Sequence, residues 1–532
     1  MRKYQMRKRA AFLGALICIF TSNALAVVLQ FFKGDVLDNA IAGEIHSTIK
    51  YGLLLISFIL GECLFYYLYK RCTAKFVVGC TKLLKRDIFE SILQRDYVSY
   101  KGQQQGAYIA KLTNDSDSIK DRRFRILPMF FDILFKIVFV SVALFLLDWR
   151  LAFITIALLT TPLYIPKLIE KRLQNAQTEY LKAVEQHLSK VNDWLSGFEI
   201  IKNFSVEQQI LKRFDETNDL TMEKLLRDTM LSAAAQLITT LISYLSYFIV
   251  LVCATWLVLR GDFSAGDFFV AIGMIDQLSY PLISLAEIIR QLVAIKPTCK
   301  EMERFIAEGT ESKAEGLLNG VKRGIHYRKV SFAYPNCSPI LREFDFSAEA
   351  GKRYLIKGPS GCGKTTAVNL LLRYYDASDG QIEIDGTPIN RYGSTYDCMT
   401  VVRQEAVLFH DTLRNNLTMY RDISDDVLIK MLNRLGLSKF ANPQALDEDV
   451  AENGANLSGG EKKRICLARA LLRDTDVLIL DEPLANLDET TACIIEDLLL
   501  SIRGRLMLVV SHQFSEEKLR RFDKVITLNP VN

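Results

Sequence analysis

The chain is organised around one stretch of its 532 residues: Gly358-Pro359-Ser360-Gly361-Cys362-Gly363-Lys364-Thr365. The stretch fits the phosphate-loop pattern G-x-x-x-x-G-K-[ST] at every defined position, between a strand-like run at 353–357 and a helix-like run at 366–372. Its glycines let several backbone N–H groups converge beside a helix N-terminus, where partial positive charge favours a polyphosphate. We therefore expect Lys364 to reach the β- and γ-phosphates of a nucleotide and the Thr365 hydroxyl to hold Mg²⁺.

The composition indicates a chain divided between membrane and water. Half of the residues are hydrophobic, yet 24% are charged and the formal net charge is only +5. A chain of 532 residues is long enough for two or more domains. A net charge this small does not indicate nucleic acid as a partner. The 11 cysteines include no C-x-x-C pair, and several fall in apolar runs, so neither a disulfide framework nor a zinc site is expected.

Six apolar runs predict membrane-spanning helices, at about residues 10–32, 49–69, 127–147, 150–166, 232–259 and 267–296. Each approaches the roughly 20 residues that cross a bilayer core, and the third and fourth form a tight hairpin. A cleaved signal peptide is the alternative for the first run, disfavoured because further spans follow. The long segments 70–126 and 167–231 are rich in Lys and Arg, so both termini and both long loops are expected in the cytoplasm.

Helical periodicity at 82–93 and 180–191 predicts that the spanning helices continue into the cytoplasm. Each pair of extensions needs a turn that touches the soluble domain, expected at 114–120 and 198–206; solvated helix ends are the alternative. Some polar residues within the spans either line a transport path or pair between helices. Asp132 and Lys136, four residues apart, are placed to pair with each other.

The second half carries two further strand ends with polar residues. The buried-strand pattern at 477–480 ends in Asp481, expected to hold Mg²⁺ through water, and Glu482, expected to orient the attacking water. The strand at 506–511 leads to His512, which would open on the same crevice of a parallel sheet and contact the γ-phosphate. Tyr334, just before a proline turn, would either stack on an adenine ring or serve as an ordinary core tyrosine.

The segment Leu457-Ser458-Gly459-Gly460-Glu461 contains two signals at once. Ser458 and Glu461 have the spacing of a capping box that opens a helix over 462–472. The two glycines at that helix N-terminus also predict a second anion site, because free backbone N–H groups and the helix dipole meet there.

Taken together, these residues resemble the ATP-binding cassette transporters, specifically the exporter half-transporters with a six-helix membrane domain ahead of the cassette. Leu457–Glu461 looks like the family signature, Gln404 like the Q-loop glutamine and Mg²⁺ ligand, and Asp488 like the D-loop aspartate. By the same resemblance Tyr334 is the adenine-stacking aromatic, Glu482 the catalytic glutamate and His512 the switch histidine, and the nucleotide also contacts Thr366, Ser458, Gly459 and Gly460. The departures are Glu461 where Gln is common, Ala485-Asn486 where Ser-Ala is common, and Cys362 inside the phosphate loop.

The resemblance implies a fold and a set of domains. We expect an all-α membrane domain of six helices at 1–306 with the type I exporter (type IV) fold, and a linker at 307–323. An α/β P-loop NTPase cassette is expected at 324–532, with an antiparallel β subdomain and an α-helical signature subdomain.

The resemblance also implies an activity: a dimer that binds ATP and Mg²⁺ and drives export of a lipid, drug-like molecule or peptide across the cytoplasmic membrane. A homodimer is favoured because every motif is intact, although such a half also occurs in heterodimers. An ATP-gated regulator or channel, or an importer, remains the alternative; a soluble cassette ATPase conflicts with the predicted spans.

Overall fold

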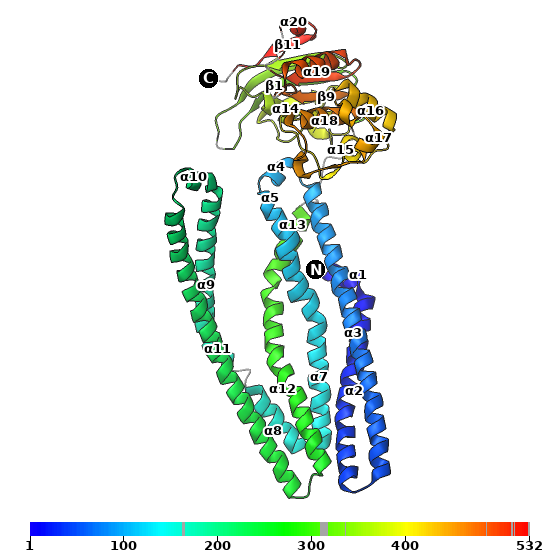
Figure 1. Ribbon diagram of the computed structural model, residues 1–532, viewed down its shortest axis with the longest axis vertical. Helices are drawn as coiled ribbons and strands as arrows, with labels where there is room; N and C mark the ends of the chain where they lie inside the picture. The colour runs from blue at the N-terminus through cyan, green and yellow to red at the C-terminus, as the bar shows by residue number, and fades with distance from the viewer. Residues whose placement is uncertain are drawn as a thin grey trace. The chain divides into compact units, whose positions relative to one another are not determined.

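The computed structural model describes residues 1–161, 165–308, 316, 318–335, 337–485, 487–511, 514 and 516–529. It divides into two compact units. The first, Met1–Gln94 with Gln104–Gly309, is built from helices, and the second, Arg95–Gln103 with Thr310–Asn532, contains the sheets (Figure 1). The second unit therefore includes a short piece of the first half of the chain.

Long and short helices make up the first unit: α1 (Arg2–Arg7), α2 (Arg9–Ile41), α3 (Ile45–Gln94), α5 (Gln105–Ala110), α6 (Ser116–Ile119), α7 (Ile126–Leu147), α8 (Trp149–Thr160), α9 (Ile165–Ser196), α10 (Phe198–Asn203), α11 (Glu207–Leu259), α12 (Ala265–Ala294) and α13 (Lys296–Glu308). The π-helical segments Lys111–Asp115 and Lys120–Arg125 join α5, α6 and α7 into one helix, Gln105–Leu147. Helix α11 is 53 residues long and contains neither glycine nor proline.

Four helices of the described part are long and apolar enough to cross a membrane: Arg9–Ile41, Ile45–Gln94, Gln105–Leu147 and Glu207–Leu259. Helix α8 contributes a shorter apolar stretch, Trp149–Leu158. Helix α12 has 30 residues with Pro281 inside, and it is not among the four. The structure thus agrees with a multi-pass membrane protein, while the full set of six spans stays a prediction.

The core of the first unit joins helices from different parts of the sequence. Val140 and Leu144 of α7, Leu151 of α8, Ala254 of α11 and Met274 of α12 belong to one buried cluster. Apolar side chains meet there although the helices are distant in sequence, so packing positions the spans relative to one another.

The predicted tight hairpin between residues 147 and 150 is confirmed. Helix α7 ends at Leu147, and the carboxylate of Asp148 accepts hydrogen bonds from the backbone N–H groups of Arg150 and Leu151, at 2.7 and 3.1 Å. Asp148 is therefore the N-cap of α8, which allows the second helix to start at once.

The predicted pairing of Asp132 with Lys136 is wrong. The Asp132 carboxylate accepts a hydrogen bond from the side-chain amide of Asn23, on α2, at 3.0 Å. A contact between helices takes the place of one along the helix, because α2 and α7 pack together and Asn23 is buried between them.

One of the two predicted turns lies elsewhere. Residues 114–120 fall inside the continuous helix Gln105–Leu147, so no turn forms there. The chain turns instead at Arg95–Gln103, around α4 (Tyr97–Lys101), whose N-cap Asp96 accepts from the Ser99 backbone N–H at 2.7 Å. The turn expected at 198–206 is present, since α10 connects α9 to α11 there. Its contact with the soluble domain stays a prediction.

Two main sheets form the second unit. The parallel sheet has the order β11-β3-β10-β9-β6 and the antiparallel sheet the order β2-β1-β4-β5. Their strands are β1 (Gly324–Phe332), β2 (Leu341–Glu349), β3 (Arg353–Lys357), β4 (Asp379–Ile384), β5 (Thr387–Pro388), β6 (Met399–Val402), β9 (Val477–Asp481), β10 (Leu506–Val510) and β11 (Lys524–Thr527), and a small ribbon joins β7 (Asp411–Thr412) to β8 (Asp449–Val450). Strands β9 and β10 are buried throughout, as the apolar runs 477–480 and 506–510 predict, and β9 also buries Asp481 at its end.

The helices of the second unit are α14 (Lys364–Leu371), α15 (Leu413–Thr418), α16 (Asp425–Arg434), α17 (Pro443–Leu446), α18 (Gly459–Leu472), α19 (Glu489–Ser501) and α20 (Glu516–Leu519). One buried core joins α14 to both main sheets, and a second core gathers α15 to α19 beside β9 and β10. This arrangement confirms the predicted α/β cassette with an antiparallel subdomain and a helical subdomain.

Candidate nucleotide-binding site

The phosphate loop connects β3 to α14, as the sequence predicts. Gly363 is the N-cap of α14 with φ of 98°, and a Cβ at this position would crowd Ile340 and Leu341, so glycine is required there. The Lys364 ammonium group donates to the backbone carbonyls of Gly358 and Pro359, each at 2.8 Å. Its charge is thereby held over the loop, where a phosphate would lie.

The loop divides into exposed and buried residues. Pro359, Ser360, Gly361 and Thr365 are exposed, which agrees with the contacts predicted for them. Cys362 is only 2% exposed and belongs to the hydrophobic core, so its predicted contact with nucleotide is restricted to its backbone.

The predicted metal ligands Thr365 and Asp481 lie together although 116 residues separate them. The Thr365 hydroxyl donates to Oδ2 of Asp481 at 3.3 Å, and Nη1 of Arg403 lies 3.7 Å from the same oxygen. Burial raises the pKa of Asp481, and the nearby Arg403 charge opposes that rise. A hydroxyl and a carboxylate are hard oxygen donors of the kind that Mg²⁺ prefers, so this pair fits the predicted ion. Gln404 follows Arg403 and is exposed just beyond the carboxyl end of β6, the strand beside β9.

The backbone of Glu482 is held in an unusual conformation directly after β9. Its φ is 52°, and its N–H donates to the Val510 carbonyl at 2.8 Å. The ammonium group of Lys463, on α18, donates to the carbonyl of Glu482 and, at 3.1 Å, to that of Ala485. Strain of this kind is typical of functional positions.

Sequence reasoning missed Lys463. It is 6% exposed, and burial lowers its pKa. It lies five residues beyond Ser458 in a helix with further basic residues, and nothing in that pattern distinguishes a buried lysine from an exposed one. His512, predicted beside the γ-phosphate, lies outside the described residues.

The predicted capping box of α18 is confirmed. The Ser458 hydroxyl accepts from the Glu461 backbone N–H at 3.3 Å, and the Glu461 carboxylate accepts from that of Ser458 at 2.9 Å. Ser458 and Gly459 are exposed, so the N-terminus of this helix is accessible.

Asp488, expected to contact nucleotide, caps α19. Its carboxylate accepts from the Thr491 backbone N–H at 2.9 Å and from the Thr490 hydroxyl. These hydrogen bonds hold the pKa of Asp488 below its usual range. The carboxylate is therefore ionised and oriented at neutral pH.

Tyr334 lies next to the helix of the phosphate loop. Its hydroxyl is 3.4 Å from that of Thr366, and its ring meets Phe332 and Tyr375 edge-on, at centroid distances of 4.9 and 5.1 Å. The ring is half-buried, so part of it stays available for stacking.

Removing the cap of α18 tests its local contribution. We expect Ser458→Ala to cost about 1 kcal/mol locally and to speed amide exchange in the first turn of α18 about fivefold. Hydrogen exchange on the full chain in detergent measures this. Ser424→Ala is the matched control, because Ser424 is the N-cap of α16 without a side-chain capping bond. Equal exchange changes in the two variants would contradict the prediction.

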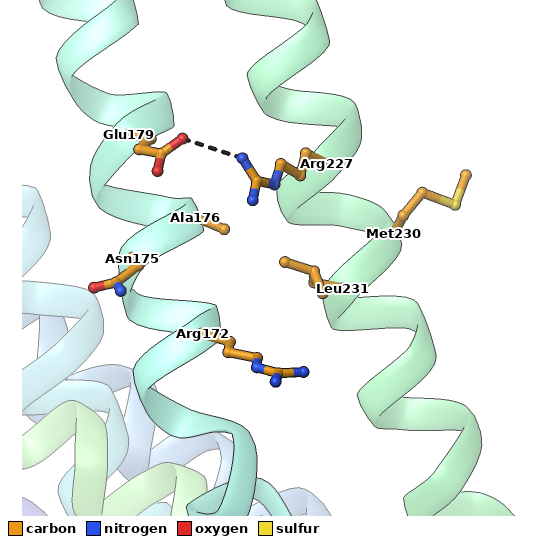
Figure 2. Close-up of a pocket in the computed structure, with 7 residues that line it drawn as sticks. All are labelled: Arg172, Asn175, Ala176, Glu179, Arg227, Met230 and Leu231. Carbon is orange, nitrogen blue, oxygen red and sulfur yellow. Dashed lines mark hydrogen bonds and ion pairs between the residues drawn. The ribbon is translucent and has the colours of Figure 1, made fainter.

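A cavity of about 600 Å³ lies in the first unit between α9 and α11. Figure 2 shows Ala176 and Leu231 facing each other, with Arg172 reaching toward α11 on one side and the Arg227–Glu179 pair on the other. The lining residues are Arg172, Asn175, Ala176, Glu179, Arg227, Met230 and Leu231. Sequence reasoning did not select these residues, because their grouping depends on how the two helices pair.

Two family models match the chain: "ABC transporter transmembrane region" over residues 12–282 and "ABC transporter" over 341–485. An uncharacterised ABC transporter ATP-binding protein of Bacillus subtilis, YwjA, is 28% identical over 84% of this chain and 80% of that protein. An ATP-dependent lipid A-core flippase of Syntrophus aciditrophicus is 25% identical over 97% of this chain and 87% of that protein. A solved bacterial Atm1-family ABC exporter with ATP bound shares the fold, with a TM-score of 0.79 and 22% identity over 98% of this chain and 94% of that one.

Proposed function

The chain belongs to the ABC transporter family, in which ATP hydrolysis drives transport, and on that premise we propose that it exports an amphipathic, acidic substrate as a homodimer. The proposal places it in the cytoplasmic membrane with the cassette in the cytoplasm. One observation carries the ATPase part: the hydrogen bond of Thr365 to Asp481, which joins the phosphate loop to the acidic end of β9.

The residues of the site divide the chemistry between them. Lys364 neutralises phosphate charge, and Thr365 and Asp481, with Gln404, would hold Mg²⁺, which spreads the charge that develops on the transferred phosphoryl group. Glu482 holds the attacking water and takes its proton on the carboxylate. Tyr334 stacks on the base. Ser458, Gly459 and Gly460 present backbone N–H groups to the nucleotide of a second copy, since a helix N-terminus attracts phosphate.

The completeness of the motifs supports a homodimer. One kind of chain supplies a phosphate loop with Lys364, an acidic strand end with Glu482 and a signature with Ser458. Two copies therefore contain everything that two composite sites require.

The cavity of Figure 2 supports the substrate class. Arg227 is engaged by Glu179 at 3.5 Å, whereas none of the carboxylate side chains that the structure describes forms an ion pair with Arg172. Guanidinium groups suit phosphate and carboxylate head groups, and Ala176 and Leu231 add an apolar wall. The apolar run predicted at 232–259 starts directly after Leu231, so the cavity lies where α11 would leave the hydrocarbon. One relative is a lipid flippase by name, which agrees with an amphipathic substrate.

Transport of labelled lipids tests this proposal. In proteoliposomes, we expect ATP-dependent translocation of fluorescent phosphatidylglycerol to exceed that of phosphatidylcholine, and Glu482→Gln to abolish both. Arg172→Gln should raise the concentration of acidic lipid needed for half-maximal ATPase stimulation about fivefold, because it removes one charged contact. Arg213→Gln, an exposed arginine on α11 outside the cavity, is the matched control.

The outcomes separate the parts of the proposal. Equal effects of Arg172→Gln and Arg213→Gln would overturn the assigned substrate class and leave the ATPase in place. ATP hydrolysis without translocation of any tested amphiphile would favour the ATP-gated regulator over the exporter.

A further inference from the structure

Helix α4 belongs to the second unit and packs within that unit through aromatic stacking. The Tyr97 ring lies parallel to that of Tyr374, with centroids 3.9 Å apart and planes at 6°, and meets Tyr375 edge-on at 6.2 Å. Tyr374 and Tyr375 come shortly after α14, the helix that begins with Lys364. Helix α4 thus contacts the residues that directly follow the phosphate-loop helix.

Arg403 lies between this stack and the predicted metal ligand. Its guanidinium carbon is 5.2 Å from the centre of the Tyr374 ring, and its Nη2 donates to Oδ1 of Asn369, on α14, at 2.7 Å. Its Nη1 is 3.7 Å from Oδ2 of Asp481, and the side chain is 28% exposed. One planar cation therefore touches the aromatic stack, the phosphate-loop helix and the buried carboxylate.

The Asp481 carboxylate cannot bind the divalent cation and Arg403 equally well at the same time. Its Oδ2 accepts from Thr365 and attracts Arg403, and in the proposed function the same carboxylate holds the divalent cation. Two cations beside one buried carboxylate repel each other, because the Coulomb energy is large where water is scarce. As Asp481 engages the metal, the attraction that draws Arg403 toward it weakens, and the guanidinium is left to Asn369 and Tyr374.

We propose that Arg403 is a positioning residue that competes with the divalent cation for Asp481. When the metal binds, the position of Arg403 against Tyr374 changes, and this alters the Tyr374–Tyr97 stack. The inference rests on the proposed function, since it requires that the cassette bind ATP with a metal. It assigns Arg403 two separable properties: a positive charge that weakens metal binding, and a flat surface that holds Tyr374 in place for α4.

Metal affinity is measured directly with Mn²⁺ in place of Mg²⁺. In the full chain carrying Glu482→Gln, electron paramagnetic resonance reports Mn²⁺ bound with ATP. We expect Arg403→Gln to bind Mn²⁺ about fivefold more tightly, because it removes the competing charge. Arg403→Lys, which keeps the charge, should retain the affinity of the parent.

Amide exchange of residues 95–103 reports the second property. Binding of Mn²⁺ to the ATP complex should change this exchange in the parent protein, and both Arg403→Gln and Arg403→Lys should lose the response, because neither keeps the planar group against Tyr374. Tyr97→Ala should also lose it while keeping Mn²⁺ affinity. Val98→Ala, at an exposed position on the same helix, is the control and should behave as the parent.

The proposal is overturned if Arg403→Gln leaves both the Mn²⁺ affinity and the exchange response unchanged. A variant that keeps ATP affinity is folded at the site. If Arg403→Gln does not bind ATP, Arg403→Lys and Tyr97→Ala test the proposal instead, and it is overturned if both keep the exchange response. A parent protein that binds no ATP would instead refute the proposed function itself, so the two failures are distinguishable.

Discussion

Glu482→Gln is expected to lower ATP turnover at least about a hundredfold, the usual contribution of a positioned general base. The backbone of Glu482 is held by Val510 and Lys463 independently of its carboxylate, so the variant should keep the local structure. ATP binding should therefore stay within about threefold of the parent value, since the change does not touch the phosphate loop.

Phosphate release and equilibrium ATP binding by the full chain in detergent check this result. Glu489→Gln, an exposed carboxylate in the first turn of α19, is the matched control and should turn over normally. Hydrolysis by Glu482→Gln at the parent rate would show that another group activates the water.

Lys364→Met is expected to weaken ATP binding about a hundredfold, because charge-assisted hydrogen bonds to phosphate are among the strongest polar contacts. The Lys364 ammonium group is already placed over the loop by the carbonyls of Gly358 and Pro359, so little reorganisation is needed to meet a phosphate. A fluorescent ATP analogue measures the dissociation constant. Lys352→Met, at an exposed position before the opposite end of β3, should bind normally. A dissociation constant for Lys364→Met near that of the control would rule out this role.

Local motifs were predictable from the sequence because local contacts fix them. The phosphate loop depends on glycines beside Lys364, and the capping box on Ser458 and Glu461, three residues apart. Contacts between distant residues left no such pattern. Lys463 and Arg403 look like ordinary surface cations in the sequence, and only the packing of α18 and β6 against β9 gives them buried acceptors.

The misplaced first turn has a physical cause. Periodicity shows that a segment is helical, but the end of a helix depends on capping groups. Asp96 and Ser99 supply such a cap at α4, whereas the polar run at 114–120 contains no group that ends the helix. In the structure that run continues the helix Gln105–Leu147 through two π-helical segments.

Hydropathy predicted the positions of the apolar segments more accurately than the residues at which their helices begin and end. Helix α3 runs over Ile45–Gln94, far beyond the apolar window at 49–69, because a helix can continue into water once it has left the hydrocarbon.

The unbroken length of α11 has a mechanical consequence. Its 53 residues correspond to a rod of about 80 Å at 1.5 Å per residue. Sharp kinks in helices arise mostly at proline or glycine, and this helix has neither, so a tilt at one end is carried to the other without being absorbed on the way. A tilt of about 10° would swing the far end through about 14 Å for a rod of this rise per residue. The displacement of the far end of α11 thus scales with the length of the helix. A pair of glycines placed midway along α11 would let the helix bend there and would reduce this displacement.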